Sequence, residues 1–293
     1  MIDNYLWEEL AVFAQSQTLV KTADKLHVTQ PTLTRGMKKL EADLGVQLFN
    51  RHPNRISLTE TGKLAAKEAA AILAANQYAV DKIQNFAQSQ RVIQVGATIP
   101  GPLVMLKRFR SQLPESIRLD THLQTQSIPD LLNNRELTLV LSNQEILTAE
   151  VDSRYVGVES LSVNLNQFMY QANQPDVTFS DLTGLSFLVL ADIGPWIMLI
   201  EHHIPNAKFL YQQQPDSFSE ITRYSDFPFF STNLSKFSPE FKHRITQDDS
   251  RVEVPISDSA AHMVVYANYL KSQAAVVTPI IEQMVQKWPN NPD

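Results

Sequence analysis

The sequence predicts an α+β protein built from more than one domain, and three observations along its 293 residues carry that prediction. The first part reads as short helices followed by a hairpin, and it holds an excess of positive charge. A long helix follows, because neither Pro nor Gly interrupts residues 63–88. Strand-like and helix-like patterns then alternate to the end of the chain, which is typical of α/β units.

Residues 1–59 read as three helices and a wing. Residues 3–16 place apolar side chains on one side, and the hydroxyls of Thr18 and Thr29 suit the N-caps of the next two helices. Gly45 suits the end of the third helix, since glycine accepts the left-handed backbone found there. Residues 46–59 read as two short strands around a turn at Pro53-Asn54. We therefore expect a winged helix-turn-helix domain.

Residues 60–88 predict a linker helix that pairs with a second copy. Seven side chains recur at alternating steps of four and three, the spacing of a packed helix seam. Asn76 would fix the register of that pair. The seam residues are Ala65, Ala69, Ile72, Asn76, Ala79, Ile83 and Phe86.

Residues 89–293 predict an α/β domain of two subdomains, the first at about 91–160 and 267–293 and the second at about 161–266. A strand is expected at 92–96 and a helix at 102–113. Further strands are expected at 118–123, 138–141, 186–190 and 274–277, and further helices at 127–133 and 257–269.

Charge divides the chain into a basic head and an acidic body. Residues 21–67 hold nine Lys or Arg against four acidic residues, whereas residues from 91 onward hold 15 basic against 22 acidic ones. Although the net charge of the whole chain is −6, the head carries an excess of positive charge, which suits binding to a polyanion.

Several classes of function are disfavoured by what the sequence lacks. It has no cysteine, so disulfides, thiol catalysis and cysteine-bound zinc are excluded. No apolar run is long enough to cross a bilayer, and residues 1–10 carry acidic residues where a signal peptide would be basic. We expect a cytoplasmic protein with no membrane partner, no metal and no cofactor.

The third helix has the side chains of a DNA-reading helix. Such a helix enters the major groove with compact polar residues at its N-terminal end, where Gln can pair with adenine and Thr methyl groups can touch thymine. Arg35 and Lys38 suit phosphate or guanine, and Arg51 and Arg55 on the wing suit the neighbouring minor groove. The predicted DNA-binding residues are Thr29, Gln30, Pro31, Thr32, Thr34, Arg35, Lys38, Arg51 and Arg55.

The head also resembles the LysR-type transcriptional regulators over about residues 5–62. The resemblance rests on Thr22-Ala23, Leu26, Val28-Thr29-Gln30-Pro31, Leu33-Thr34, Leu40-Glu41, Leu44-Gly45, Leu48-Phe49, Arg51, Leu58-Thr59 and Gly62. Gly36-Met37 departs from it, because the family usually has larger residues there, and glycine inside a helix costs about 1 kcal/mol.

The resemblance implies a transcriptional regulator that binds an imperfect inverted repeat in double-stranded DNA as a homodimer or as a dimer of dimers. It implies antiparallel pairing of linker helices and a regulatory domain similar to periplasmic solute-binding proteins. RNA polymerase is a further candidate partner. The sequence leaves open dimer or tetramer, and activation or repression.

In such a domain the effector lies in a cleft near strand ends and helix N-termini, which favour a small organic anion. Thr98 and Ser127 resemble positions where the family often has hydroxyls, although both also suit helix caps. The predicted effector-binding residues are Thr98, Pro100, Gln126, Ser127, Trp196 and Thr232.

Two other classes of function compete with this interpretation. His202-His203, with Glu201 or Asp192, is the cluster that suggests an enzyme, but adjacent residues of a helix point about 100° apart and do not form a site alone. A head that binds a protein instead of DNA is the second alternative, and a regulator without an effector is a third. The sequence favours a DNA-binding regulator and no enzyme.

Overall fold

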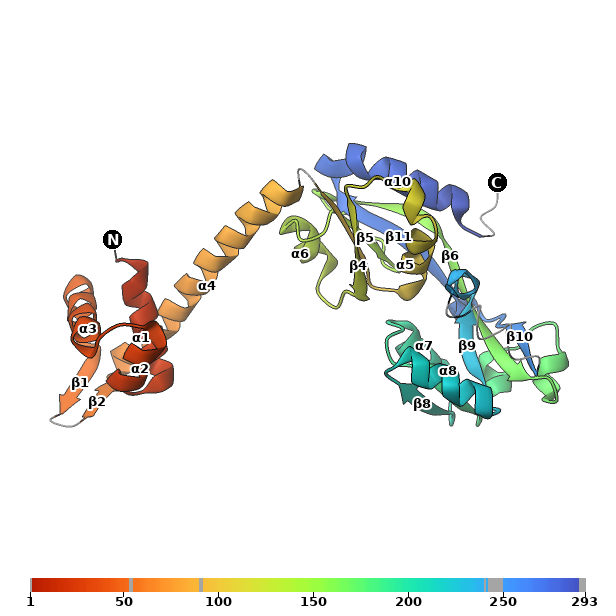
Figure 1. The fold of residues 1–293 in the computed structure, drawn as a ribbon, viewed down its shortest axis with the longest axis horizontal. Helices are drawn as coiled ribbons and strands as arrows, with labels where there is room; N and C mark the ends of the chain where they lie inside the picture. The colour runs from red at the N-terminus through yellow and green to blue at the C-terminus, as the bar shows by residue number, and fades with distance from the viewer. Residues whose placement is uncertain (1, 53–54, 90–91, 240, 242–249, 290–293) are drawn as a thin grey trace. The chain divides into compact units, whose positions relative to one another are not determined.

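A computed structural model describes residues 2–52, 55–89, 92–239, 241 and 250–289. The chain forms two compact units, Met1–Gln84 and Asn85–Asp293. Figure 1 follows the chain through a helical unit, a long helix and a unit built on a mixed sheet. This is the α+β architecture that the sequence predicts.

The first unit is a helix-turn-helix with a two-stranded wing. Its elements are α1 (Asn4–Ser16), α2 (Leu19–Leu26), α3 (Gln30–Leu44), β1 (Phe49–His52) and β2 (Arg55–Leu58), the strands pairing antiparallel. Both predicted caps are present, since the hydroxyl of Thr18 accepts from Lys21 N and that of Thr29 from Thr32 N. Gly45 ends α3 with a φ of 70°. The turn at Pro53-Asn54 lies outside the described residues.

A single core holds the wing against the helices. The rings of Phe13 in α1 and Phe49 in β1 meet edge to face, with centroids 5.4 Å apart. Leu33, Met37 and Leu40 of α3 are buried in the same cluster. The inner face of α3 is thus anchored, and its outer face stays in solvent.

Helix α4 (Glu60–Ser89) begins inside this unit. Gly62 lies against the backbone of Leu48, where an added Cβ would stand 2.1 Å from the carbonyl oxygen. Ala66 and Ala69 are buried in the core of the head. From Ile72 onward most of the apolar side chains of α4 are exposed.

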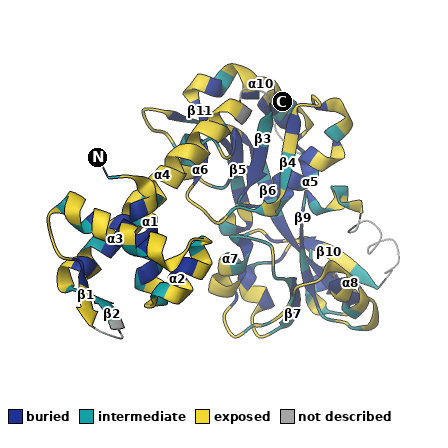
Figure 2. Cartoon of the chain, turned by 60° about the vertical axis from the view of Figure 1, so that its left-hand side comes forward, coloured by how far each residue is buried: buried dark blue, intermediate teal, exposed yellow. Residues whose placement is uncertain are grey.

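The second unit is organised by one nine-stranded mixed sheet in the order β4-β3-β5-β11-β6-β9-β7-β8, with β10 pairing β6. The strands are β3 (Ile93–Ala97), β4 (Ile117–Leu123), β5 (Leu139–Ser142), β6 (Val151–Asn166), β7 (Ser186–Leu190), β8 (Lys208–Gln212), β9 (Phe229–Thr232), β10 (Arg251–Pro255) and β11 (His262–Leu270). Most residues of β3, β5, β7, β9 and β11 are buried, whereas most residues of β4, β8 and β10 are not (Figure 2).

Five α-helices and six short 3-10 turns accompany this sheet within the described residues. The α-helices are α5 (Pro100–Arg108), α6 (Ile128–Asn133), α7 (Trp196–His203), α8 (Pro215–Tyr224) and α10 (Ala274–Lys287). The 3-10 turns are η1 (Arg110–Gln112), η2 (Tyr170–Asn173), η3 (Phe179–Leu182), η4 (Ser235–Phe237), η5 (Ser259–Ala261) and η6 (Lys271–Gln273).

Strand β6 belongs to both halves of the sheet. Residues 151–160 pair with β11, whereas residues 161–166 pair with β9 and β10. The partner of β6 therefore changes between Ser160 and Leu161. Residues close to this change can meet side chains from both halves.

Two predictions for the body are wrong: a predicted helix is a strand, and a predicted strand is the start of a helix. Residues 257–269 were expected to be helical but contain β11, a run of β-branched and aromatic residues that is buried on both faces towards its end. Residues 274–277 were expected to be a strand but begin α10, because Val277, Ile280, Ile281 and Met284 form a buried stripe at helical spacing. Short apolar runs do not by themselves separate the two structures.

Candidate functional site

The N-terminal end of α3 presents a polar surface. Thr29, Gln30, Pro31 and Thr32 are exposed, and Thr34 is half-buried. The hydroxyl oxygens of Thr29 and Thr32 lie 2.9 Å apart, which orders the first turn. The structure thus brings together the predicted polar residues of this helix.

One basic side chain of α3 is paired with an acidic residue, and two others are not paired among the described residues. Lys39 Nζ lies 2.7 Å from a carboxylate oxygen of Asp3 and so ties α3 to the start of α1. Among the described residues, Arg35 and Lys38 have neither a hydrogen-bond nor an ion-pair partner, and both are exposed. These two cations are free to meet a phosphate or a base edge.

Glu41 clamps the wing to α3, a role that the sequence did not reveal. One carboxylate oxygen accepts from the N–H groups of Leu48 and Phe49 at 2.9 and 3.0 Å, and the other accepts from Arg51 Nη2 at 2.7 Å. Arg51 is therefore held at the base of the wing. Arg55 starts β2, and its side chain lies outside the described part of the structure.

A buried carboxyl lies beneath the middle of α3. Glu9 is 6% exposed, and its Oε2 has no hydrogen-bond partner among the described residues. Burial, helped by the charge of Glu8, raises the pKa of Glu9 to about 7. Gly36 faces it, and a Cβ there would stand 1.8 Å from Oε2. Glycine in this helix therefore leaves room for the carboxyl.

The predicted seam of α4 splits into two parts. Ala65 and Ala69 contact the core of the head itself. Ile72, Asn76, Ile83 and Phe86 are exposed, Ile83 to 70%, and Ala79 lies on the same exposed part of the helix. Phe86 packs under the guanidinium of Arg135, 4.7 Å from its ring centroid. The exposed part of the predicted seam begins only beyond Ala69.

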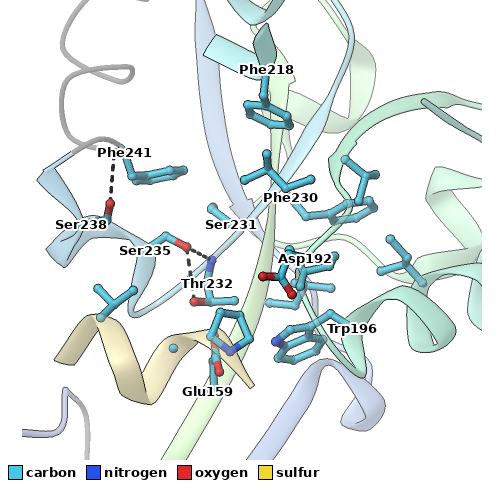
Figure 3. A pocket seen from close by; sticks show the side chains of 18 of the residues that line it. Glu159, Asp192, Trp196, Phe218, Phe230, Ser231, Thr232, Ser235, Ser238 and Phe241 are labelled. Atoms are coloured by element: carbon cyan, nitrogen blue, oxygen red, sulfur yellow. Dashed lines mark hydrogen bonds between the residues drawn. The ribbon is translucent and has the colours of Figure 1, made fainter. Parts of the chain in front are cut away.

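The body encloses a cavity of about 200 Å³ where the strand partners of β6 change. Its walls come from α5, β6, β7, α7, α8 and β9, and most of the side chains that form them are apolar (Figure 3). Three predicted effector residues line it, namely Pro100, Trp196 and Thr232.

The other predicted effector residues lie elsewhere. Gln126 and Ser127 are exposed and do not line this cavity. Thr98 is not a lining residue either, although its Oγ1 is buried with no hydrogen-bond partner among the described residues. Its carbonyl lies against Gly194, where a Cβ would come within 2.6 Å. The loop before α7 thus closely approaches the end of β3.

Glu159 is a buried ionisable group that lines the cavity. It is 1% exposed, and Figure 3 shows its carboxyl beside Trp196 and Thr232. Burial raises the pKa of Glu159 to about 7, and the nearby Thr232, Trp196 and Gly101 N–H only partly oppose that effect. Neither Glu159 Oε2 nor Trp196 Nε1 makes a hydrogen bond of good geometry within the described residues.

The backbone around Glu159 is held from several sides. Asn233 accepts from Ser160 N at 2.9 Å and donates to Val158 O at 3.0 Å, and Trp288 Nε1 donates to the same carbonyl at 2.9 Å. Gly101 of α5 faces the carboxyl, and a Cβ there would stand 2.4 Å from it. A single glutamate within strand-like sequence gave no signal of this role.

The histidine pair has a structural explanation. The ring of His203 stacks on Phe179 with centroids 5.2 Å apart, and Glu201 accepts from the hydroxyl of Tyr211 at 2.6 Å. Among the described residues, no three His, Asp or Glu side chains are grouped to hold a metal ion. Nor does any helix of that part combine the length and hydropathy needed for a bilayer crossing.

Comparisons with known proteins agree with this architecture. Residues 7–63 match the family described as bacterial regulatory helix-turn-helix protein, lysR family. The Hca operon transcriptional activator HcaR of Escherichia coli (strain K12) is 26% identical over 179 residues, which are 60% of each chain. The regulator BsdA of Bacillus subtilis (strain 168) is 37% identical over 97 residues, which are 32% of this chain and 33% of BsdA.

A solved structure extends the likeness of fold to the full length. DarR of Vibrio fischeri, crystallised in complex with DNA, is 14% identical, with a TM-score of 0.60 over 98% of this chain and 99% of that one. The chain spans 60% of the length of HcaR, and the named relatives are regulators and not enzymes. Residues 7–63 thus resemble the lysR family of bacterial regulatory helix-turn-helix proteins, and the fold of the whole chain is similar to that of DarR.

Proposed function

We propose that this chain is a sequence-specific DNA-binding transcriptional regulator whose binding mode is changed by a small-molecule effector in the cavity of the body. The observation that carries the proposal is the outer face of α3. That face joins exposed Thr29, Gln30 and Thr32 to two unpaired cations, and its inner face is fixed in the core. A rigid polar helix of this kind suits the major groove.

The residues of α3 divide into two roles. Thr34 and Arg35 lie where base edges would be read, so we assign sequence preference to them. Lys38 lies farther along the helix and suits phosphate, which contributes affinity without preference. On the wing, Arg51 is oriented by Glu41, and Arg55 stays a predicted contact.

The effector would act through the assembly of the regulator. Exposed apolar residues of α4 support pairing with a second copy, as a homodimer or homotetramer. Binding in a cavity whose walls come from both halves of the body would alter how the bodies pack and hence the spacing of the heads. Its place of action would be the cytoplasm, with RNA polymerase as a further candidate partner.

The first experiment is a gel shift of the full chain with DNA from upstream of its own gene and with random DNA, in a series of salt concentrations. We expect a discrete complex that prefers the upstream DNA and weakens steeply with salt, because phosphate contacts release counterions. No preference at any salt concentration would favour a head that binds a protein.

Three variants separate the two roles of α3. Thr34→Ala and Arg35→Ala should lose about 1–3 kcal/mol on the upstream DNA and much less on random DNA. Lys38→Ala should weaken both DNAs alike and reduce the salt slope by about 1. Equal losses on both DNAs for all three variants would contradict this division.

A further inference from the structure

The cavity in the body has acidic groups but no basic ones among the described residues that line it. Glu159 and Asp192 are its ionisable side chains, and Lys, Arg and His are all missing from its described walls. Asp192 is exposed to solvent, whereas Glu159 is 1% exposed. A ligand that fills the cavity therefore meets one desolvated carboxyl, a few serine and threonine hydroxyls, and many apolar side chains.

We propose that this cavity binds a small apolar amine, with the ammonium group held by the carboxylate of Glu159 and the apolar body enclosed by Trp196, Phe230 and their neighbours. The inference rests on the proposed function, because it names the class of the effector. It differs from the organic anion that the sequence predicts.

The charge of ionised Glu159 disfavours an anion in this cavity. An anionic ligand would lose its water while facing Glu159, with no described cation to balance it, and buried charges need a partner. A cation supplies the partner that Glu159 Oε2 lacks. The indole of Trp196, which lines the same space, also favours a cation beside an aromatic ring.

The shape of the cavity limits the ligand to a small one. Pockets for drug-sized ligands have about 300–1,000 Å³, and this cavity has about 200 Å³. Side chains such as Val104, Leu161, Ile193 and Ile200 make the walls apolar. One ring or a short branched chain with a single amino group matches this space.

Binding should couple to a proton. Burial raises the pKa of Glu159 to about 7, so the free carboxyl is partly protonated near neutral pH. The groups that face it are Thr232 of β9, Trp196 of α7 and the Gly101 N–H of α5, and Asp192 shares the cavity. His262 of the neighbouring β11 is bonded to Ser160 instead. An alkyl ammonium stays charged near neutral pH, so Glu159 must give up its proton to pair with it.

The test compares head groups on one apolar body. Thermal stabilisation and calorimetry of the full chain are measured with benzylamine, benzyl alcohol and benzoate, and with cyclohexylmethylamine, cyclohexylmethanol and cyclohexanecarboxylate. We expect each amine to bind about tenfold or more tightly than its alcohol and carboxylate. Amine affinity should rise about tenfold from about pH 6 to about pH 8, as Glu159 ionises.

Variants assign the effect to Glu159. Glu159→Gln should lower amine affinity about tenfold or more and remove its dependence on pH. Glu201→Gln is the matched control, because it removes the same charge from α7 outside the cavity and should leave amine binding unchanged. If Glu159→Gln does not fold, the comparison of amines, alcohols and carboxylates on the unaltered chain still tests the proposed ligand class.

Several results would overturn the inference. They are tighter binding of the carboxylates, equal binding of amines and alcohols, no binding by either amine, or full amine affinity in folded Glu159→Gln. The gel shift on the same samples keeps the two proposals apart. Retained DNA preference with no amine binding rejects only the ligand class, whereas amine binding without DNA preference rejects only the regulator.

Discussion

Gly36 and Glu9 lie in contact, and the glycine leaves the space that the Glu9 carboxyl occupies. Alanine is favoured over glycine inside a helix by about 1 kcal/mol, so Gly36 is unfavourable for α3 considered alone. The carboxyl of Glu9 occupies the space that a Cβ would take. The departure from the family pattern at Gly36 therefore has a structural cause in α1.

This pair predicts non-additive changes in stability. Gly36→Ala should give no gain in the unaltered chain, because Glu9 must move, but should stabilise the head by about 1 kcal/mol in a Glu9→Ala background. Thermal unfolding of the single and double variants measures the coupling. Equal effects of Gly36→Ala in both backgrounds would show that the two residues do not interact.

Glu159 predicts how the stability of the body depends on pH. Its pKa is raised from an ordinary value of 4.5 to about 7 in the folded chain, so the folded state holds the proton more strongly. Its contribution to stability is present below about pH 4.5 and is lost as pH rises to about 7. Glu159→Gln should thus stabilise the body by up to about 3 kcal/mol at pH 8 relative to pH 5.

Urea unfolding followed by tryptophan fluorescence at the two pH values measures that difference. The unaltered chain without ligand is compared with Glu159→Gln in each buffer. An equal difference in unfolding free energy at both pH values would mean that Glu159 titrates normally.

At the scale of elements, Glu41 of α3 makes polar contacts with the start of the wing. Glu41→Ala removes a charged acceptor from two backbone N–H groups and from Arg51. We expect a loss of about 2 kcal/mol from the head and weaker DNA binding. Glu68→Ala, on the exposed surface of α4, should change stability by less than about 0.5 kcal/mol. Similar losses in both variants would remove the special role of Glu41.

The exposed part of α4 predicts a test of self-association. Ile83→Glu places a charge on the apolar surface and should shift the chain towards monomer in sedimentation experiments. Ala74→Glu is the matched control, because nine residues at about 100° each put it on the opposite side of the helix. An unchanged oligomer in Ile83→Glu would show that the chains pair through another surface.

At the scale of the whole molecule, the proposal links the cavity to the DNA. A saturating effector should change the length of the footprint or the bend angle of the upstream DNA, because the spacing of the heads changes. Footprinting with and without the effector, and with Glu159→Gln as the unresponsive variant, measures this. An identical footprint and bend in all cases would contradict the coupling.

The sequence predicted the head better than the body for a physical reason. The caps at Thr18 and Thr29 and the helix end at Gly45 are local signals, and the structure has each of them where the sequence predicts it. The predictions for β11 and for the start of α10 were wrong because the apolar runs there are short, and tertiary packing decides whether such a run forms a strand or a helix. Glu41 acts through partners in the next element, and Glu159 and Asn233 act through partners distant in sequence, so no periodic pattern indicated their contacts.

Strand β6 has a consequence for how this protein can be divided. Each half of the body sheet uses part of the same sixteen-residue strand, so neither half has all its edges satisfied without it. A fragment that ends inside residues 151–166 would expose unpaired backbone and tend to aggregate. The body should therefore unfold cooperatively, and fragments of it should express poorly. A division of the chain near residue 85 would instead follow the boundary between the two units.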